Sequence, residues 1–132
     1  MKAFYKTLRT GTPTSTTAVN PQGWSALMAP ILAAGQDILI LAFSSGLSST
    51  YAAAVLAAQE LAPQYPGRTI RVVDTLCASM GQGLLVYHAV QRQQAGESLE
   101  QVADFVEATK LHLCHWFTVD DLMFLKRGGR IS

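Results

Sequence analysis

The chain has 132 residues, the size of one domain with a buried core. Its composition is 49% hydrophobic and 14% charged, with a formal net charge of +1, so it is apolar and nearly neutral. The sequence has no basic block or interleaved aromatic platform, which argues against a nucleic-acid partner. The longest apolar runs have six or seven residues, so no transmembrane segment is expected, and the N-terminus lacks the apolar core of a signal peptide.

The cysteine content indicates a reducing compartment. Cys77 and Cys114 lie far apart, with no spacing typical of a disulfide framework. Both are therefore expected to be buried, reduced thiols, and a cytoplasmic location is predicted. The low charged fraction also favours an apolar surface that binds a partner, a ligand tail or a further part of the chain.

Two helices are predicted in the first part of the chain. Met1–Arg9 has the pattern of a short amphipathic helix, and Thr10–Thr17 is a loop rich in hydroxyls, glycine and proline. Asn20 and Pro21 predict the next helix start, a capping side chain followed by proline, and Gly35 suits its end. Apolar residues recur in it at the spacing of a helix with one buried face: Trp24, Leu27, Met28 and Ile31.

A buried strand followed at once by a helix is predicted next. The continuous apolar run Ile38–Phe43 is typical of a parallel strand covered on both faces. A helical stripe of apolar residues then occupies Leu47–Ala62. Ser44, Ser45 and Ser48 lie where this helix needs a cap, so one of them is expected to bond the first free N–H groups.

The second half of the chain continues the alternation. Thr69–Val73 is β-branched and predicts a strand ending at Asp74, where an aspartate that caps the next turn is commoner than a catalytic one. Ala78–Ala95 predicts a helix with Gly81 and Gly83 near its start. Each glycine destabilises a helix by about 1 kcal/mol relative to alanine, so a close approach to a neighbouring backbone or ligand is expected there.

The remaining elements are shorter. Ser98 and Gln101 form a capping-box pattern that opens another helix. His115–Val119 predicts a third strand, and Asp121–Lys126 a short helix that ends at a glycine pair. The order of elements predicts a single α/β domain over residues 1–132, with an open, largely parallel sheet sandwiched by helices.

The best candidate site is the turn Ser44-Ser45-Gly46. Ligands of open α/β sheets bind beyond the carboxyl ends of the strands, and a helix N-terminus there favours an anion. Hydroxyl groups can donate hydrogen bonds to a carboxylate or a phosphate. Serine is also a preferred helix cap, so the residues alone leave binding and plain capping open.

Other chemistries have weaker support. The nucleophile elbow Gly-x-Ser-x-Gly is absent, because Phe43 stands where Ser45 would need a small residue. His112 and His115 lack the further ligands of a tetrahedral metal site, so no metal is expected. Gly81-Gln82-Gly83 lacks the third glycine of a dinucleotide fingerprint.

Taken together, the motifs resemble the DegV family of bacterial fatty-acid-binding proteins. The serine turn and the C-terminal block carry the resemblance most specifically, and the pieces follow in the family's order across almost the whole chain. The matching pieces are Thr14-Ser15, Ser44–Tyr51, Val73–Thr75, Gly81–Gly83 and Val119–Ser132.

The resemblance implies a two-domain α/β protein that holds a long-chain fatty acid between its domains. Hydroxyl groups bind the carboxylate, the tail enters an apolar tunnel, and the protein presents the acid to a fatty acid kinase without performing chemistry itself. No metal or organic cofactor is implied. Family members have sequence before the start of this chain and a second domain after its end, so the chain is expected to be partial. The ligand-binding residues implied are Thr14, Ser15, Ser44, Ser45 and Arg130.

Three functional hypotheses follow. The first is a lipid carrier with the carboxylate at the residues just named. The second is a serine esterase or thioesterase that uses Ser44 or Ser45 as nucleophile. The third is a binding module for a small phosphorylated ligand at the same helix N-terminus.

Overall fold

The computed structural model describes residues 2–12, 16–129 and 131. The chain divides into two compact units. The larger unit is Ala18–Thr118, and the smaller one combines Met1–Thr17 with Val119–Ser132. The two units are described separately below.

The larger unit is built on two parallel strands. Strand β1 (Ile38–Ala42) pairs with β2 (Ile70–Asp74) in parallel, from Ile38 opposite Ile70 to Ala42 opposite Asp74. The strands therefore end level with each other, and the chain segments that follow them leave the sheet at the same edge. The first two predicted strands and their parallel direction are confirmed.

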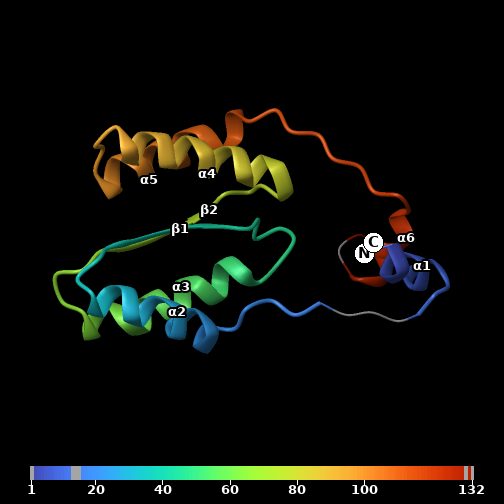
Figure 1. Ribbon diagram of the computed structural model, residues 1–132, viewed down its shortest axis with the longest axis horizontal. Helices are drawn as coiled ribbons and strands as arrows, with labels where there is room; N and C mark the ends of the chain where they lie inside the picture. Colours follow the sequence, from blue (N-terminus) through green and yellow to red (C-terminus); the bar gives the residue numbers. More distant parts are fainter. Residues whose placement is uncertain (1, 13–15, 130, 132) are drawn as a thin grey trace. The chain divides into compact units, whose positions relative to one another are not determined.

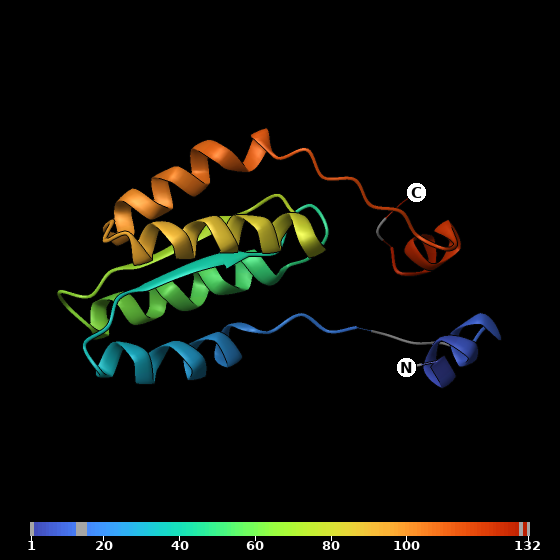
Figure 2. The ribbon, with the colours of Figure 1, turned by 45° about the horizontal axis from the view of Figure 1, so that its top comes forward.

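Helices cover both faces of this sheet (Figures 1 and 2). Helix α2 (Pro21–Ala33) and helix α3 (Thr50–Leu61), which continues into the short 3₁₀ turn η1 (Ala62–Gln64), lie on one face. Helices α4 (Ser79–Gln94) and α5 (Leu99–Thr109), the latter followed by η2 (Lys110–His112), lie on the other face. The predicted α/β fold with a parallel sheet between helices is confirmed.

Each face of the sheet has its own hydrophobic core. Successive side chains of a strand point to opposite faces, so the apolar run of β1 supplies both cores. The α2–α3 side is filled mainly by aliphatic side chains and small alanines: Met28, Leu32, Ile38, Ile40, Ala42, Ala54, Ala57 and Leu61. The α4–α5 side contains Val73, Cys77, Leu85, Ala89, Val102, Ala103 and Val106, with Leu39 and Leu41 packed against them.

The helix ends follow the expected capping chemistry. Asn20 Oδ1 accepts the backbone N–H of Gly23 at 2.8 Å, and Gly35 ends the segment with a φ of 79°. Ser98 and Gln101 form both hydrogen bonds of the capping box at the start of α5. The face that α2 buries agrees with the prediction only in part. Met28 is buried and Trp24 packs against the core, whereas Leu27 and Ile31 are exposed.

Helix α3 begins at Thr50, three residues later than the apolar stripe predicted. The backbone N–H groups of Leu47 and Ser48 both bond to the Ser44 carbonyl oxygen, which closes a separate turn before the helix. Ser48 Oγ then accepts the N–H of Thr50 at 3.2 Å. The prediction that one of the serines bonds a free N–H at this helix start is confirmed.

The predicted third strand at His115–Val119 is wrong, because residues 113–119 have no regular secondary structure. Leu113 packs against the α4–α5 core, but Trp116 is 96% exposed and Phe117 is 65% exposed. A β-rich sequence becomes a strand only where a neighbouring strand offers its edge. Cys77 is buried as predicted, whereas Cys114 is exposed, so that part of the cysteine prediction is also wrong.

The smaller unit contains two short helices, α1 (Lys2–Arg9) and α6 (Leu122–Arg127). Asp121 Oδ1 accepts the N–H of Met123 at 2.8 Å and caps α6, and Arg9 forms an exposed ion pair with Asp120 at 3.0 Å. Both helices were predicted. Among the helices that the structure describes, none combines the length and apolarity that crossing a membrane requires.

Candidate ligand-binding site

The turn after β1 is held in place by the backbone and hydroxyl of Ser44. This residue is buried, its N–H donates to the Cys77 carbonyl oxygen at 3.0 Å, and its Oγ accepts the N–H of Gly46 at 3.2 Å. Ser44 therefore fixes the path of the chain between the strand and helix α3.

Ser45 is exposed and is held from the neighbouring strand. Its backbone N–H donates to Asp74 Oδ1 at 3.1 Å, and its side chain contributes to lowering the pKa of this carboxyl group. The same Oδ1 accepts the N–H of Leu76 at 3.1 Å. Asp74 thus caps its own turn, as the sequence predicted, and also binds the serine turn. The level ends of the two strands make this possible.

The environment of Asp74 keeps its carboxyl group ionised. Partial burial acts to raise the pKa, but hydrogen bonds from the Ser45 side chain and from the backbone of Leu76 and Ser45 oppose it. The positive charge of Lys110 acts in the same direction, and the net result is a pKa below the usual 3.8. Lys110 Nζ also donates to the backbone oxygen of Asp74 at 3.0 Å.

The loop between β2 and α4 is braced against β1. Thr75 is buried, and its Oγ1 donates to the Ala42 carbonyl oxygen at 2.7 Å. Gln82 Nε2 donates to the Leu41 carbonyl oxygen at 2.9 Å. Leu76 and Ser79 have φ values of 53° and 49°. Residues other than glycine rarely adopt such values, which persist only where the surrounding structure holds them.

The glycine pair of α4 has two different surroundings. A Cβ on Gly81 would lie 2.7 Å from Cγ of His115, so a close approach is present, but to a side chain and not to the backbone or ligand that was expected. At Gly83 a Cβ would meet nothing within 4 Å, so no neighbouring backbone explains this glycine. His115 Nδ1 also lies 4.0 Å from Cys77 Sγ. The pKa of the Cys77 thiol is raised, mainly by burial and to a smaller extent by the negative charge of Asp74.

The residues predicted to bind the carboxylate fall into two groups. Ser44 and Ser45 lie together at the carboxyl end of β1, where the sequence placed them. Thr14, Ser15 and Arg130 lie outside the described residues. Within the part of the chain that the structure describes, no three metal-ligating side chains come together.

Two residues at this site were not predicted to act there. Asp74 was expected to cap its own turn, although two adjacent parallel strands indicate that its carboxylate could reach the serine turn. The bond from Gln82 to the end of β1 had no signal in the sequence. It depends on where the first turn of α4 lies against the sheet.

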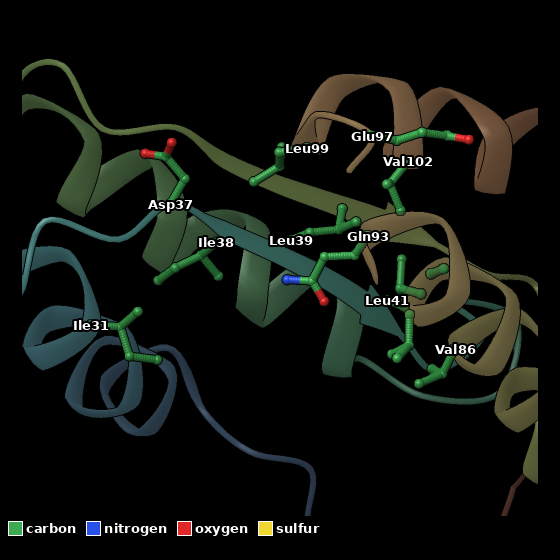
Figure 3. A pocket seen from close by; sticks show the side chains of 12 residues that line it. Ile31, Asp37, Ile38, Leu39, Leu41, Val86, Gln93, Glu97, Leu99 and Val102 are labelled. Carbon is green, nitrogen blue, oxygen red and sulfur yellow. The ribbon is translucent and has the colours of Figure 1, made fainter. Parts of the chain in front are cut away.

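An apolar groove runs along the side of β1 that faces away from β2 (Figure 3). Its volume is about 590 Å³. Strand β1 forms the floor, Ile31 of α2 forms one wall, and α4 and α5 form the other. The lining residues are Ile31, Asp37, Ile38, Leu39, Leu41, Val86, Ala89, Val90, Gln93, Glu97, Leu99 and Val102.

A parallel sheet between helices, with hydroxyl groups at its strand ends, defines an α/β protein with a potential ligand site at the carboxyl edge of the sheet. The model of the DegV family, described as a family of uncharacterised proteins, matches residues 1–132. The chain therefore belongs to the DegV family, and the resemblance read from its motifs is confirmed.

Relatives and solved structures agree with this assignment. A DegV domain-containing protein of Clostridium perfringens is 48% identical over 131 residues, which cover 99% of this chain and 45% of that protein. A DegV family protein of Thermus thermophilus, whose structure is described as showing fatty acid binding, is 36% identical, with a TM-score of 0.80. That match covers 97% of this chain and 44% of the other.

A DegV protein of Thermotoga maritima, described as lipid-binding, is 27% identical with a TM-score of 0.69, over 84% of this chain and 38% of its own. A stearic acid-binding protein of Eubacterium ventriosum has a TM-score of 0.84 over 99% of this chain and 45% of its own, and at 23% identity it supports the fold alone. The chain spans less than half the length of the relatives described here.

Proposed function

We propose that this chain binds a long-chain fatty acid, with the carboxyl end of the acid at Ser44 and Ser45. The observation that carries the proposal is the turn itself, where two adjacent hydroxyls are fixed at the carboxyl edge of a parallel sheet. The similar Thermus thermophilus structure, described as fatty acid binding, supports the same class of ligand. Thr14, Ser15 and Arg130, which the resemblance to the family implies, are further proposed ligands of the carboxyl group, and the proposal needs no metal or organic cofactor.

The groove along β1 is the proposed place for the acyl tail. Its lining along β1 begins at Asp37, just before the strand, and ends at Leu41, three residues before Ser44. From Ile38 to Ser44 an extended chain covers about 20 Å at about 3.3 Å per residue, which suits a long-chain acid. Most of the lining side chains are aliphatic, so burial of the methylene groups of the tail is favourable.

Carriage is preferred to catalysis because the histidines of the chain have other contacts. His88 contacts the rings of Tyr87 and Phe105, and His112 Nδ1 lies 2.8 Å from the Ala108 oxygen. His115 lies against Gly81 and Cys77. We therefore assign the serines to binding and propose that the protein presents its fatty acid to a kinase.

Because Cys77 and Cys114 are free thiols, we place the protein in the reducing cytoplasm.

The proposal is tested by the retention of lipid. Native mass spectrometry of the purified chain, before and after denaturation, is expected to show the release of one long-chain fatty acid. Delipidated protein is expected to take up a fluorescent fatty acid. Ser45→Ala is expected to weaken this uptake roughly tenfold, the effect of losing a hydrogen bond of about 1.4 kcal/mol.

Ser49→Ala is the matched control. Ser49 is exposed in the same turn, and its side chain makes no capping bond to α3. Uptake by Ser49→Ala is expected to equal that of the unchanged chain. Protein that carries no lipid and takes up none contradicts the proposal.

The groove is tested separately by filling it. Val90 lines the groove on α4, so Val90→Trp is expected to displace part of the tail. Because each buried methylene contributes about 0.8 kcal/mol, displacing two weakens palmitate binding roughly tenfold. Leu56→Trp, on an exposed position of α3 outside the groove, is the control. Equal affinities of both variants for palmitate would place the tail elsewhere.

Two further assays distinguish the alternative functions. Labelling by a fluorophosphonate probe that disappears in Ser44→Ala or Ser45→Ala would indicate an esterase or thioesterase. Calorimetric titration with simple phosphate esters and with laurate separates a phosphate-binding module from a fatty-acid carrier. The carrier proposal expects heat from laurate alone.

A further inference from the structure

Gly83 is a glycine inside helix α4 that the fold itself does not require. Glycine is a poorer residue than alanine in the interior of a helix, so its presence there needs a reason. Gly83 is not among the residues with a positive φ. A Cβ on it would meet nothing within 4 Å, so no neighbouring backbone among the described residues demands its small size. The reason that is left is the close approach of a ligand.

Gly83 lies on the side of α4 that lines the groove. Val86 and Val90 are groove residues, three and seven positions further along the helix. Residues at this spacing follow one another along one side of a helix. Gly83 is exposed and lies about one turn closer to the start of α4 than Val86, the first residue of α4 in the groove lining. The groove side of α4 therefore continues toward the helix start without a side chain at this position.

The first turns of α4 lie against the end of β1. Gln82, the residue before Gly83, donates its side-chain N–H to the Leu41 carbonyl oxygen at 2.9 Å. Leu41 is also the last residue of β1 in the groove lining, and Figure 3 shows it at the same end of the groove as Val86. The serine turn begins three residues after Leu41, at Ser44. Gly83 therefore lies beside the stretch that separates the groove from the serine turn.

In the proposed binding mode, the acyl chain must cross this stretch. The carboxyl group lies at Ser44 and Ser45, and the tail lies in the groove that ends at Leu41. Three residues of extended chain span at most about 10 Å, so the carbons next to the carboxyl group occupy the interval. We infer that Gly83 is the specificity-determining residue of this passage, because the absence of a Cβ lets these carbons lie against α4. This inference rests on the proposed function.

The inference gives stability and binding opposite responses to the same substitution. Alanine and leucine are better helix formers than glycine, so ligand-free Gly83→Ala and Gly83→Leu should unfold at higher urea concentrations than the unchanged chain. Both variants should bind palmitate more weakly. The expected loss is roughly fourfold for Gly83→Ala, the effect of displacing about one methylene group, and roughly tenfold or more for Gly83→Leu. A glycine with a purely structural role would lose stability and affinity together.

Gln91→Leu is the matched control. Gln91 is exposed on α4 and is not part of the groove lining, so the same leucine is added to the same helix away from the passage. Its affinity for palmitate should equal that of the unchanged chain. Affinities are measured by the displacement of a fluorescent fatty acid, and stabilities by urea unfolding of the delipidated proteins.

A direct observation on the unchanged chain uses ¹³C-labelled palmitate. Isotope-filtered nuclear Overhauser spectra detect the protons of the labelled acid that lie near protons of the protein. Contacts are expected between the α protons of Gly83 and the methylene groups next to the carboxyl group, and none with the terminal methyl group. The protein signals are assigned to Gly83 by their loss in Gly83→Ala.

The outcomes separate the inference from the proposed function. Equal affinity of Gly83→Leu and the unchanged chain, or a loss of stability together with affinity, overturns the inference and leaves fatty-acid binding intact. Contacts of Gly83 with the terminal methyl group only, or with no part of the bound acid, do the same. An unchanged chain that binds no palmitate contradicts the proposed function, and the inference with it. The Overhauser contacts decide the matter even if Gly83→Leu fails to fold.

Discussion

Asp74 links two turns that follow different strands, and its contribution to stability therefore depends on pH. The carboxylate accepts backbone N–H groups from Ser45 and Leu76. These bonds hold its pKa in the folded protein below the usual 3.8. For a carboxyl group with a lowered pKa, the stabilisation is complete above the unfolded-state value and is lost as the pH falls through the folded-state value.

Asp74→Ala is accordingly expected to lower the free energy of unfolding at pH 7 by about 0.5–1.5 kcal/mol, because two exposed backbone donors lose their acceptor and bond to water instead. The difference from the unchanged chain should shrink as the pH falls below about 4. Urea unfolding followed by circular dichroism at several pH values measures both. Glu60→Ala, at an exposed position of α3, serves as the control, and a loss for Asp74→Ala that is equal at pH 7 and pH 3 contradicts this account.

At the scale of the element, helix α4 contains two glycines that differ in function. Gly81 is buried, and the ring of His115 occupies the space that a Cβ would need. Gly83 is exposed and has open space around it. Alanine is favoured over glycine in a helix interior, so the two positions should respond differently to the same substitution.

Gly83→Ala is expected to raise the free energy of unfolding by up to about 1 kcal/mol. Gly81→Ala should not show this gain, because the new Cβ would lie 2.7 Å from Cγ of His115. Adding His115→Ala to Gly81→Ala should restore the gain. Thermal unfolding of these three variants and of His115→Ala completes the cycle, and equal gains in both single glycine variants would refute a steric role for His115.

At the scale of the whole molecule, both hydrophobic cores belong to the larger unit. Helices α1 and α6 of the smaller unit contribute no buried residue among those described. The energy that drives cooperative folding therefore comes mainly from Ala18–Thr118.

A shortened chain of residues 18–118 is expected to keep a cooperative unfolding transition and the helical circular dichroism of its own elements. It lacks Thr14, Ser15 and Arg130, so its affinity for palmitate should be weaker than that of the full chain by roughly tenfold or more, the effect of losing one or two charge-assisted hydrogen bonds. A shortened chain with full affinity would exclude these three residues from the site. Loss of the cooperative transition would show that the smaller unit is needed for folding.

Patterns within one element predicted most of this fold. The run Ile38–Phe43 and the β-branched Thr69–Val73 gave both strands, and the caps at Asn20 and Ser98 gave the helix starts, because these signals depend on neighbouring residues. The serine turn was found for the same reason. The strand predicted at His115–Val119 failed because a strand also needs a partner, which local sequence does not contain.

Contacts between elements at the site could not be predicted from the sequence. Nothing local to Ser45 indicates that its backbone N–H is bound by a carboxylate 29 residues further along the chain. The buried face of α2 was predicted only in part for a similar reason, since Leu27 and Met28 are equally apolar and only the position of the sheet distinguishes them.

The register of β1 and β2 determines whether the two turns of this site meet. Ala42 lies opposite Asp74, so Ser45 and the aspartate meet only while both strands have matched lengths up to the sheet edge. An insertion or deletion of one residue inside either strand would shift one turn by about 3.3 Å and turn the side chains beyond it to the other face. Insertions or deletions should therefore be tolerated in the connection between Leu61 and Thr69, which precedes the paired residues. Between Ile70 and Asp74 they should abolish the contact between Ser45 and Asp74.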